Sequence, residues 1–327
     1  MPNILTIFIV TLNIFGLILI TGSSGFIGKA TALYFLKNQK SPIVLVDFFT
    51  SNNDELQKCQ FVHTDDLFDF LDFKKNQITF IIHLGAITDT TEQNADLLSK
   101  YNLSYSKVIW SKCVQYSISL IYASSAATYG NGRLGFSDDH KKVSLFKPLN
   151  LYAHSKHDFD KYILAQKNKP PMWFGLKFFN VFGFDESKKG KMSSIILQAF
   201  NQILKTNQMK LFKSNDPTIK DGDQCRDFIY IDDVLDVIFF LYTNKIKSGI
   251  YNVGTGKVTT FNNIISYVFS SMQKNKLIEY IDMPSALRNQ YQSHTRADVN
   301  KLRSMGYKKE FLNIEEAISQ YINNYLV

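Results

Sequence analysis

The stretch LILITGSSGFIG, residues 17–28, decides the fold of this chain. It starts with an apolar run, which predicts a short strand buried on both faces of a parallel sheet. Gly22, Gly25 and Gly28 follow at the spacing G-x-x-G-x-x-G, and residues 29–38 then read as a helix. Glycines in this context permit a tight turn and let backbone N–H groups approach a pyrophosphate at the positive end of the helix. The stretch therefore predicts a dinucleotide-binding unit.

A second apolar run, residues 43–47, follows the predicted helix and completes a βαβ unit, whose crossover is right-handed almost by default. Asp47 ends this strand about 20 residues after Gly28, where a carboxylate can accept hydrogen bonds from an adenosine ribose. Further apolar runs continue the alternation of strands and helices, at residues 80–84, 120–123 and 173–178. The sequence thus predicts an α/β fold with a doubly wound parallel sheet, the Rossmann arrangement.

The chain of 327 residues is long for a single hydrophobic core, so we expect two unequal lobes. After about residue 180 the alternation gives way to polar segments rich in Lys and Asn. Residues 227–241 regain apolar character and are expected to return to the main sheet. We therefore expect a dinucleotide-binding domain and a smaller, interleaved C-terminal substrate lobe. The first comprises residues 1–178 with 227–250, and the second comprises residues 179–226 and 251–327.

The composition is that of a globular protein, with 45% hydrophobic and 20% charged residues, which excludes disordered and fibrous classes. A net charge of +8 suits anionic partners, from nucleic acid to nucleotides and phosphosugars. The basic residues are scattered, whereas a nucleic-acid binder usually gathers them on one face, so no nucleic-acid partner is expected. Cys59, Cys113 and Cys225 are too widely spaced for a disulfide framework or a metal site. We expect a reducing, cytoplasmic location and no metal.

Residues 4–20 form a mainly apolar run of borderline length for a membrane span. No Lys or Arg precedes this run, and no small-residue cleavage pattern follows it. Residues 16–20 lead directly into the glycine turn and are therefore expected to be strand. The apolar extension at residues 1–15 stays open to three interpretations: a strand, a membrane anchor or an artefact of start-site choice.

Tyr152 and Lys156 lie four residues apart, on one face of the helix expected after Pro148. A free tyrosine titrates near pH ~10. Its phenol is therefore a base at neutral pH only where positive charge stabilises the phenolate, and Lys156 and an oxidised nicotinamide would both supply that charge. Ser125 follows a predicted strand and can hydrogen-bond the same substrate oxygen. We predict that these three residues are catalytic and move a hydroxyl proton during hydride transfer.

The glycine spacing and this trio resemble the extended short-chain dehydrogenases/reductases, which form the NAD-dependent epimerase/dehydratase family. Dehydratases of this kind commonly carry two carboxylates just after the serine. Ala126 and Ala127 stand there in this chain, which indicates oxidation and re-reduction without elimination, as in an epimerase. The chain is most similar to the ADP-glyceromanno-heptose 6-epimerases, over roughly residues 16–325. The segments that carry this resemblance are residues 122–130, 147–152, 179–183, 188–192, 226–228, 251–256 and 291–292.

This resemblance implies conversion of ADP-D-glycero-D-manno-heptose to ADP-L-glycero-D-manno-heptose, for the synthesis of lipopolysaccharide core precursor. It also implies a second proton-transfer residue, Lys189, in the loop after the strand of Asn180. Inversion by transient oxidation requires hydride to return to the opposite face of the carbonyl, so one acid/base on one side is insufficient. Tyr152 and Lys189 on opposite sides solve this if the carbonyl group rotates between the two half-reactions. Alternatively, Lys189 only solvates a basic loop or binds phosphate.

The resemblance implies identical subunits in a homo-oligomer, each with one cofactor. The residues that it places against the cofactor are Gly22, Gly25, Phe26, Ile27, Gly28, Asp47, Phe48, Leu84, Gly85, Ala86, Ile87, Thr88, Asn102, Lys156, Val181 and Lys189. The family favours NADP, yet Asp47 is followed by Phe48, and Asp54 stands where a basic residue is expected. Two carboxylates would compensate a 2′-phosphate poorly, so NAD stays an alternative.

The implied substrate contacts are Asn180, Lys191, Gln198, Phe212, Lys213, Ser214, Asn215, Arg226 and Tyr291. Arg226 has an independent rationale, because a guanidinium can hold diphosphate oxygens bidentately. Its alternative role is a structural ion pair with Asp227 or Asp232. Lys191 and Gln198 replace the residue types usual in the family, which puts their contacts in doubt.

Two other functions remain open from the sequence. A UDP-hexose 4-epimerase shares the arrangement of Ser125, Tyr152 and Lys156, but usually presents one acid/base and turns the whole sugar, so Lys189 discriminates against it. A non-catalytic dinucleotide-binding sensor would keep the fold, but such proteins typically lose the tyrosine or the lysine.

Overall fold

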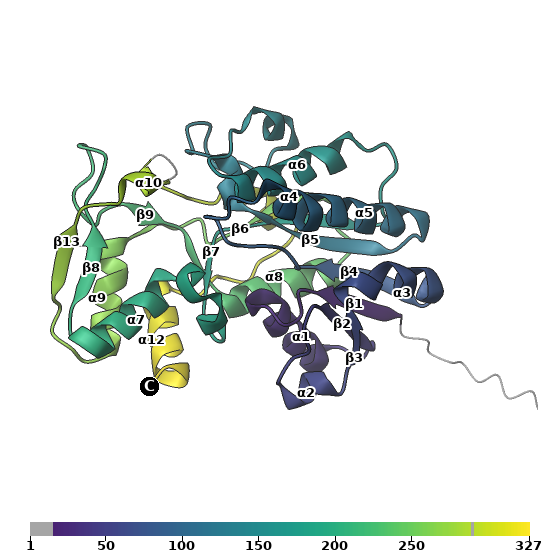
Figure 1. Cartoon of the computed structure of the whole chain (residues 1–327), viewed down its shortest axis with the longest axis horizontal. Helices are drawn as coiled ribbons and strands as arrows, with labels where there is room; N and C mark the ends of the chain where they lie inside the picture. The colour runs from purple at the N-terminus through teal and green to yellow at the C-terminus, as the bar shows by residue number, and fades with distance from the viewer. Residues whose placement is uncertain (1–15, 289–290) are drawn as a thin grey trace, which may run out of the picture.

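The computed structural model describes residues 16–288 and 291–327, which form a seven-stranded sheet with helices on both faces and a smaller lobe beside it (Figure 1). The strand order is β11-β6-β5-β4-β1-β2-β3, and every pair in this sheet is parallel. The strands are β1 (Leu17–Thr21), β2 (Ile43–Asp47), β3 (Gln60–His63), β4 (Ile78–His83), β5 (Ser119–Ser125), β6 (Trp173–Phe178) and β11 (Gly249–Val253). The order reverses beside β1, which confirms the predicted doubly wound sheet.

Each face of the sheet has its own hydrophobic core. In β1, Ile18 and Ile20 belong to one core and Leu19 to the other, as the alternation of side chains along a strand requires. The helices that pack in the first core include α1 (Phe26–Asn38) and α8 (Ile231–Thr243). The helices that pack in the second include α3 (Leu67–Lys74), α5 (Tyr105–Gln115) and α6 (Leu151–Ala165). The strands are therefore buried on both faces, which explains their continuous apolar runs.

The glycine turn between β1 and α1 is built so closely that side chains would not fit. A Cβ on Gly28 would lie 2.0 Å from the carbonyl oxygen of Gly22. Gly22 has φ +70°, and a Cβ there would lie 2.6 Å from the backbone nitrogen of Gly85. The helix begins at Phe26, before the predicted start at residue 29, because Gly25 serves as its N-cap.

Of residues 227–250, which were expected to return to the main sheet, only Gly249 and Ile250 join it, at the start of β11 (Gly249–Val253) next to β6. The first residues of that segment form β10 (Phe228–Tyr230), which pairs with β7 (Asn180–Phe182) in a separate two-stranded sheet. The apolar residues 231–241 are helical, in α8, where the Phe239 ring packs edge-on against Phe35 of α1. A run that is apolar on most sides suits a helix buried over a sheet as well as it suits a strand. The boundaries between the two lobes stay a prediction.

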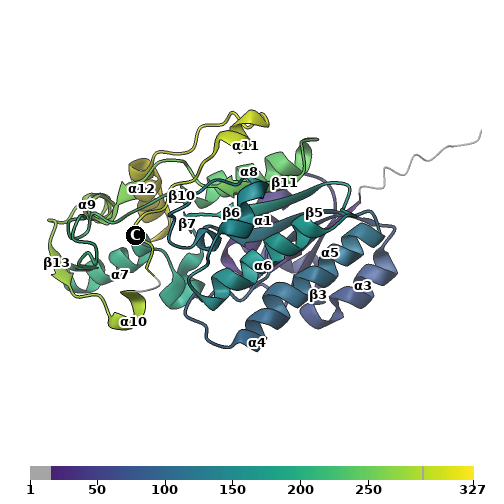
Figure 2. The same cartoon turned by 90° about the horizontal axis from the view of Figure 1, so that it is seen from above.

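The smaller lobe lies at one end of the sheet, and Figure 2 shows it from above. Its strands pair as β8 with β13 and β9 with β12. Its main elements are α7 (Ile195–Thr206), β8 (Met209–Phe212), β9 (Cys225–Arg226), β12 (Thr259–Thr260), α9 (Phe261–Ser271), β13 (Ile278–Ile281) and α12 (Ile314–Tyr325). The short helical segments of the chain are α2 (Asp54–Gln57), η1 (Thr64–Asp66), α4 (Ala95–Leu98), η2 (Ser99–Ser104), η3 (Ala126–Tyr129), η4 (His140–Leu145), η5 (Glu186–Met192), α10 (Ser285–Arg288) and α11 (Asn300–Ser304).

Within residues 16–288 and 291–327, no helix has both the length and the apolar character needed to cross a membrane. The extension at residues 1–15, with its three interpretations, lies outside the described residues.

Candidate active site

The glycine turn opens at the carboxyl end of β1, at the point where the strand order reverses. The N-cap of α1, Gly25, makes no side-chain capping bond, and the first turn of α1 holds no acidic residue. Its N–H groups are therefore available to an anion, with the helix dipole in support. Asp47, at the end of β2, accepts hydrogen bonds from the backbone N–H groups of Ser24 and Phe48, each at 2.8 Å. These residues fit a nicotinamide dinucleotide, with an anion site and a ribose acceptor on neighbouring strands.

The segment after β4 forms the next wall of this cleft. Thr21 Oγ1 lies 2.7 Å from His83 Nδ1 and accepts the N–H of Gly85 at 3.1 Å, which ties this wall to β1. Asn102 is buried, accepts the N–H of Ile87 at 2.8 Å and donates to the Ser155 hydroxyl at 3.0 Å. Asn102 thus joins the wall to α6, which explains its place in the predicted cofactor set. Leu84, Ala86 and Thr88 lie in the same segment.

The structure brings Ser125, Tyr152 and Lys156 together. Ser125 ends β5, and the other two lie one turn apart on α6, whose N-cap is Asn150. Tyr152 is 9% exposed and Lys156 is 4% exposed, so both act in a largely dry environment. Burial raises the pKa of the Tyr152 phenol, whereas its hydrogen bond with Ser125 lowers it. The Ser125 hydroxyl therefore lies beside the Tyr152 phenol, with Lys156 one turn further along α6.

The Lys156 amine is tuned by two opposing effects. Burial lowers its pKa to about 8, and the charge of Asp160, one turn further along α6, acts to raise it. At neutral pH the amine is thus mostly an ammonium, as the stabilisation of a phenolate requires.

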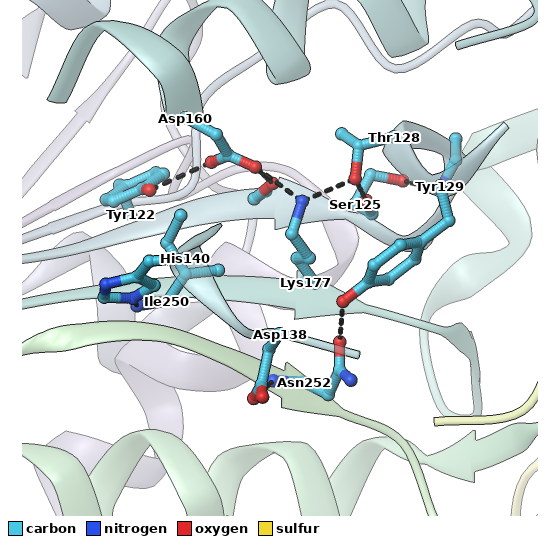
Figure 3. A network of polar contacts seen from close by, with 12 residues as sticks. Tyr122, Ser125, Thr128, Tyr129, Asp138, His140, Asp160, Lys177, Ile250 and Asn252 are labelled. Carbon is cyan, nitrogen blue, oxygen red and sulfur yellow. Dashed lines mark hydrogen bonds and ion pairs between the residues drawn. The ribbon is translucent and has the colours of Figure 1, made fainter. Parts of the chain in front are cut away.

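A buried network lies beside the trio, and the sequence analysis missed it (Figure 3). Lys177 of β6 is fully buried, and its ammonium lies 2.6 Å from the carboxylate of Asp160 and 2.5 Å from the hydroxyl of Thr128. A single lysine in the otherwise apolar run of residues 173–178 was the available signal, because a buried charge needs a buried partner.

Lys189 lies in the loop between β7 and α7, and its nitrogen is 5.2 Å from the centroid of the Phe26 ring at the start of α1. Burial lowers the pKa of Lys189, and the carboxylate of Glu186 opposes this effect. Of the two predicted alternatives, a lysine that only solvates the loop fits this half-buried position poorly, whereas a lysine that binds phosphate is compatible with it. The amine lies instead beside the first residue after the glycine turn.

Glu186 is the second functional residue that the sequence analysis missed. Its carboxylate is fully buried and accepts the N–H of Gly183 at 3.3 Å, and the N–H and hydroxyl of Ser194 at 2.6 and 2.7 Å. It therefore joins the two ends of the loop that carries Lys189. An ion pair of 2.7 Å between Lys29 of α1 and Asp185 fixes the start of the same loop. No local motif marks such a residue, since its partners become neighbours only in the folded loop.

Arg226 of β9 is 8% exposed, and its guanidinium packs 5.0 Å from the ring centroid of Tyr291 and 5.6 Å from that of Phe261. Among the described residues it forms no ion pair, so the alternative of a structural pair with Asp227 or Asp232 is wrong. The Asp227 carboxylate instead accepts backbone N–H groups, including those of residues 255, 256 and 297. The guanidinium is held by aromatic rings and leaves its charge available to a ligand.

The other predicted substrate residues are spread over the smaller lobe. Asn180 donates to the carbonyl of Asp227 at 2.9 Å, at the start of β7 and next to Val181. Lys191 and Gln198 are exposed, and the Gln198 amide donates to the backbone carbonyls of residues 191 and 193. The remaining residues lie at the end of β8 and just after it: Phe212, Lys213 with an ion pair to Asp282 at 3.1 Å, Ser214 and Asn215.

A family model and the curated relatives of this chain both point to epimerases. The model of the NAD dependent epimerase/dehydratase family matches residues 18–254. The chain is 40% identical to an ADP-L-glycero-D-manno-heptose-6-epimerase of Fusobacterium nucleatum, over 95% of this chain and 98% of that protein. It is 39% identical to an enzyme of the same name from Brachyspira hyodysenteriae, over 93% of this chain and 96% of that protein.

Solved structures agree with these relatives. The crystal structure of the Helicobacter pylori ADP-L-glycero-D-manno-heptose-6-epimerase has a TM-score of 0.80 and 28% identity, over 95% of this chain and 96% of that chain. A UDP-glucose 4-epimerase from Thermotoga maritima, solved with UDP-glucose, has a TM-score of 0.77 over 94% of this chain and 97% of that one. At 19% identity, the second likeness is one of fold alone.

Proposed function

The chain belongs to the NAD dependent epimerase/dehydratase family, and on that basis we propose that it is an ADP-L-glycero-D-manno-heptose-6-epimerase. The reaction interconverts ADP-D-glycero-D-manno-heptose and ADP-L-glycero-D-manno-heptose, for lipopolysaccharide core precursor, in the cytoplasm. Near-complete coverage of relatives that carry this name supports the assignment. The observation that supports the mechanism is the position of Lys189, whose nitrogen lies 5.2 Å from the centroid of the Phe26 ring at the start of α1, whereas Tyr152 lies on a separate element, α6.

A bound nicotinamide would supply a hydride acceptor, and then a hydride donor, for the sugar side-chain carbon, with no net redox change. The Tyr152 phenolate accepts the proton of the substrate hydroxyl, and the Ser125 hydroxyl hydrogen-bonds the same oxygen. The Lys156 ammonium stabilises the phenolate. These roles need a buried, ordered trio, which α6 and the end of β5 provide.

Lys189 handles the proton on the opposite side. After oxidation the substrate carries a ketone at the side-chain carbon, and inversion requires the other face of that ketone to meet the returning hydride. Rotation of the side chain moves the ketone oxygen away from Tyr152, so a second acid must reach it there. Desolvation of Lys189 makes its ammonium a better acid than an exposed lysine. Arg226, stacked on Tyr291, would hold the diphosphate of the sugar nucleotide.

The chain takes a nicotinamide dinucleotide, as its family does. The resemblance implies NADP, whereas the carboxylate of Asp47 at the end of β2 favours the ribose hydroxyl of NAD over a 2′-phosphate. Identification of the nucleotide released by denaturing the purified protein decides between the two.

Incubation of the purified protein with ADP-D-glycero-D-manno-heptose tests the function, with the configuration at the side-chain carbon followed by NMR. We expect inversion by the natural chain and none by the Tyr152→Phe/Lys189→Met double variant. An equal activity of that variant would overturn the mechanism. Turnover of UDP-glucose in place of the ADP-heptose would favour a hexose 4-epimerase, and tight dinucleotide binding with no turnover of either sugar would favour a sensor.

A further inference from the structure

A buried ion pair beside the catalytic trio has no part in the mechanism described so far (Figure 3). Lys177 and Asp160 are both fully buried and lie 2.6 Å apart. The Asp160 carboxylate also accepts the hydroxyl of Tyr122 at 2.9 Å and that of Ser124 at 2.8 Å. The Lys177 ammonium donates to the hydroxyl of Thr128 at 2.5 Å. All of these groups are enclosed between β5, β6, η3 and α6.

Each end of this network reaches an element that carries a residue of the trio. Asp160 lies one turn after Lys156 on α6. The Thr128 hydroxyl donates to the backbone carbonyl of Ser125 at 2.7 Å, in the turn that follows β5. We propose that Lys177 is a positioning residue of the reaction, which acts on Lys156 through Asp160 and on Ser125 through Thr128. This inference rests on the proposed function, because it takes the trio to be catalytic.

Stability alone does not account for a lysine at this position. Burial of an ion pair removes two charges from water, and apolar side chains of similar volume often give equal or greater stability. The rest of β6 is apolar and fully suited to that solution. A charge here therefore implies a role that an apolar side chain could not perform.

The electrostatic effect of Lys177 on the pKa of Lys156 has a definite sign. Asp160 raises the pKa of Lys156 against the effect of burial, and the nearby Lys177 ammonium weakens the field of this carboxylate. Without Lys177, Tyr122 and Ser124 still donate to the carboxylate, and while Asp160 is ionised its unscreened charge acts on Lys156 more strongly. Without the charge of Asp160, Lys156 loses its nearest anion. The two losses therefore move the pKa of Lys156 in opposite directions.

Other ionisable groups around the network respond at pH values far from the range of Lys156. Burial lowers the pKa of His83 to about 3 and those of His140 and His157 to about 4, and it raises those of the Tyr122 and Tyr129 phenols. The remaining groups that face the network or its neighbours are Asp138, Tyr152, Asp158, Lys161, Lys169 and Lys301. Asp158 and Lys161 pair with each other on the outer side of α6.

The test measures the pKa of Lys156 in four variants: Lys177→Met, Asp160→Asn, the double variant and Lys177→Arg. Competitive acetylation of the cofactor-free protein, read by peptide mass spectrometry, reports the Lys156 amine without turnover. The pH dependence of kcat in the holoenzyme reports the same group through its alkaline limb. We expect Lys177→Met to raise this pKa by about one pH unit and Asp160→Asn to lower it by a similar amount. The double variant should keep the Asp160→Asn shift, because Lys177 acts on Lys156 through Asp160, and Lys177→Arg should stay near the natural chain.

A separate variant tests whether the network positions Ser125. Thr128→Val removes the hydroxyl between Lys177 and Ser125, and should lower kcat about tenfold with no change in the pKa of Lys156. Thermal unfolding checks that each variant is folded.

Shifts of the same sign in the two single variants, or none in either, would overturn the proposal and leave the pair a purely structural element. If Lys177→Met does not fold, the remaining variants decide, because a double variant whose shift is much smaller than that of Asp160→Asn also contradicts it. A natural chain that binds dinucleotide but does not epimerise the ADP-heptose contradicts the proposed function instead, and the acetylation measurement still tests the coupling.

Discussion

The two groups proposed to transfer protons are held in different ways. Tyr152 lies on α6, a 15-residue helix whose inner face is packed in the core and pinned by buried polar bonds. Lys189 lies in the short loop between β7 and α7, where it contacts the ring of Phe26. The first group is positioned by the fold itself and the second by a few polar side chains. Substitutions in the loop should therefore slow the half-reaction that depends on Lys189 and leave the half-reaction that depends on Tyr152 unchanged.

The largest effects should come from the two proton-transfer residues themselves, and they should be complementary. If each serves one epimer, oxidised holoenzyme of Tyr152→Phe should oxidise one ADP-heptose epimer and fail with the other, and Lys189→Met should show the reverse. We expect a loss of about 10²–10⁴-fold for the affected epimer, as for removal of a general acid or base. The near-ultraviolet absorbance of the reduced nicotinamide, in single-turnover mixing with each epimer, measures this.

If Lys189→Met, with the dinucleotide still bound, oxidised neither epimer, Lys189 would be needed for both half-reactions rather than for one. Lys188→Met provides the matched control, because Lys188 is the exposed neighbour in the same loop.

The next effect should come from Glu186, which closes the loop through Gly183 and Ser194. In Glu186→Gln the amide nitrogen can accept no hydrogen bond, so at least one of these donors loses its partner. We expect the Lys189-dependent half-reaction to slow about tenfold, since small displacements of a catalytic group are costly, while the Tyr152-dependent half-reaction stays as it is. Single-turnover rates with the two epimers measure both.

Glu316→Gln, at an exposed position of α12, is the control for this substitution. An equal slowing of both half-reactions by Glu186→Gln would show that the carboxylate supports the smaller lobe as a whole. That result would remove the distinction between a core-held and a loop-held group.

These two regions also differ in how much of them the sequence predicts. The glycine turn and the pair Tyr152 and Lys156 are recognisable because their function depends on local spacing along one turn or one helix face. Asp160 with Lys177, by contrast, belongs to a contact between a helix and a strand, and Glu186 belongs to a loop whose ends meet only after folding. The apolar run of residues 231–241 did not indicate whether it forms a strand or a helix, and in the structure it forms α8, which packs over the sheet.

In the smaller lobe, too, the sequence alone does not predict contacts between distant segments of the chain. The sequence alone left Arg226 with two roles, and the stacking on Tyr291 and Phe261 that decides between them joins three separate segments. Lys213 was assigned to the substrate by resemblance, while its ion pair with Asp282 depends on the pairing of β8 with β13. Contacts that depend on chain topology cannot be obtained from local patterns.

The smallest effect should come from the ion pair between Lys29 and Asp185, which ties the start of the loop to α1. Partly exposed pairs of this kind contribute about 0.2–1 kcal/mol, so Lys29→Gln should slow the Lys189-dependent half-reaction about two- to fivefold. Because salt screens such pairs, higher ionic strength should slow the natural chain and leave the variant unchanged. Lys37→Gln, at an exposed position of the same helix, is the control. If Lys29→Gln slowed this half-reaction as much as Glu186→Gln, the ion pair rather than the buried carboxylate would hold the loop, and the second proton-transfer group would depend on solvent conditions far more than the first.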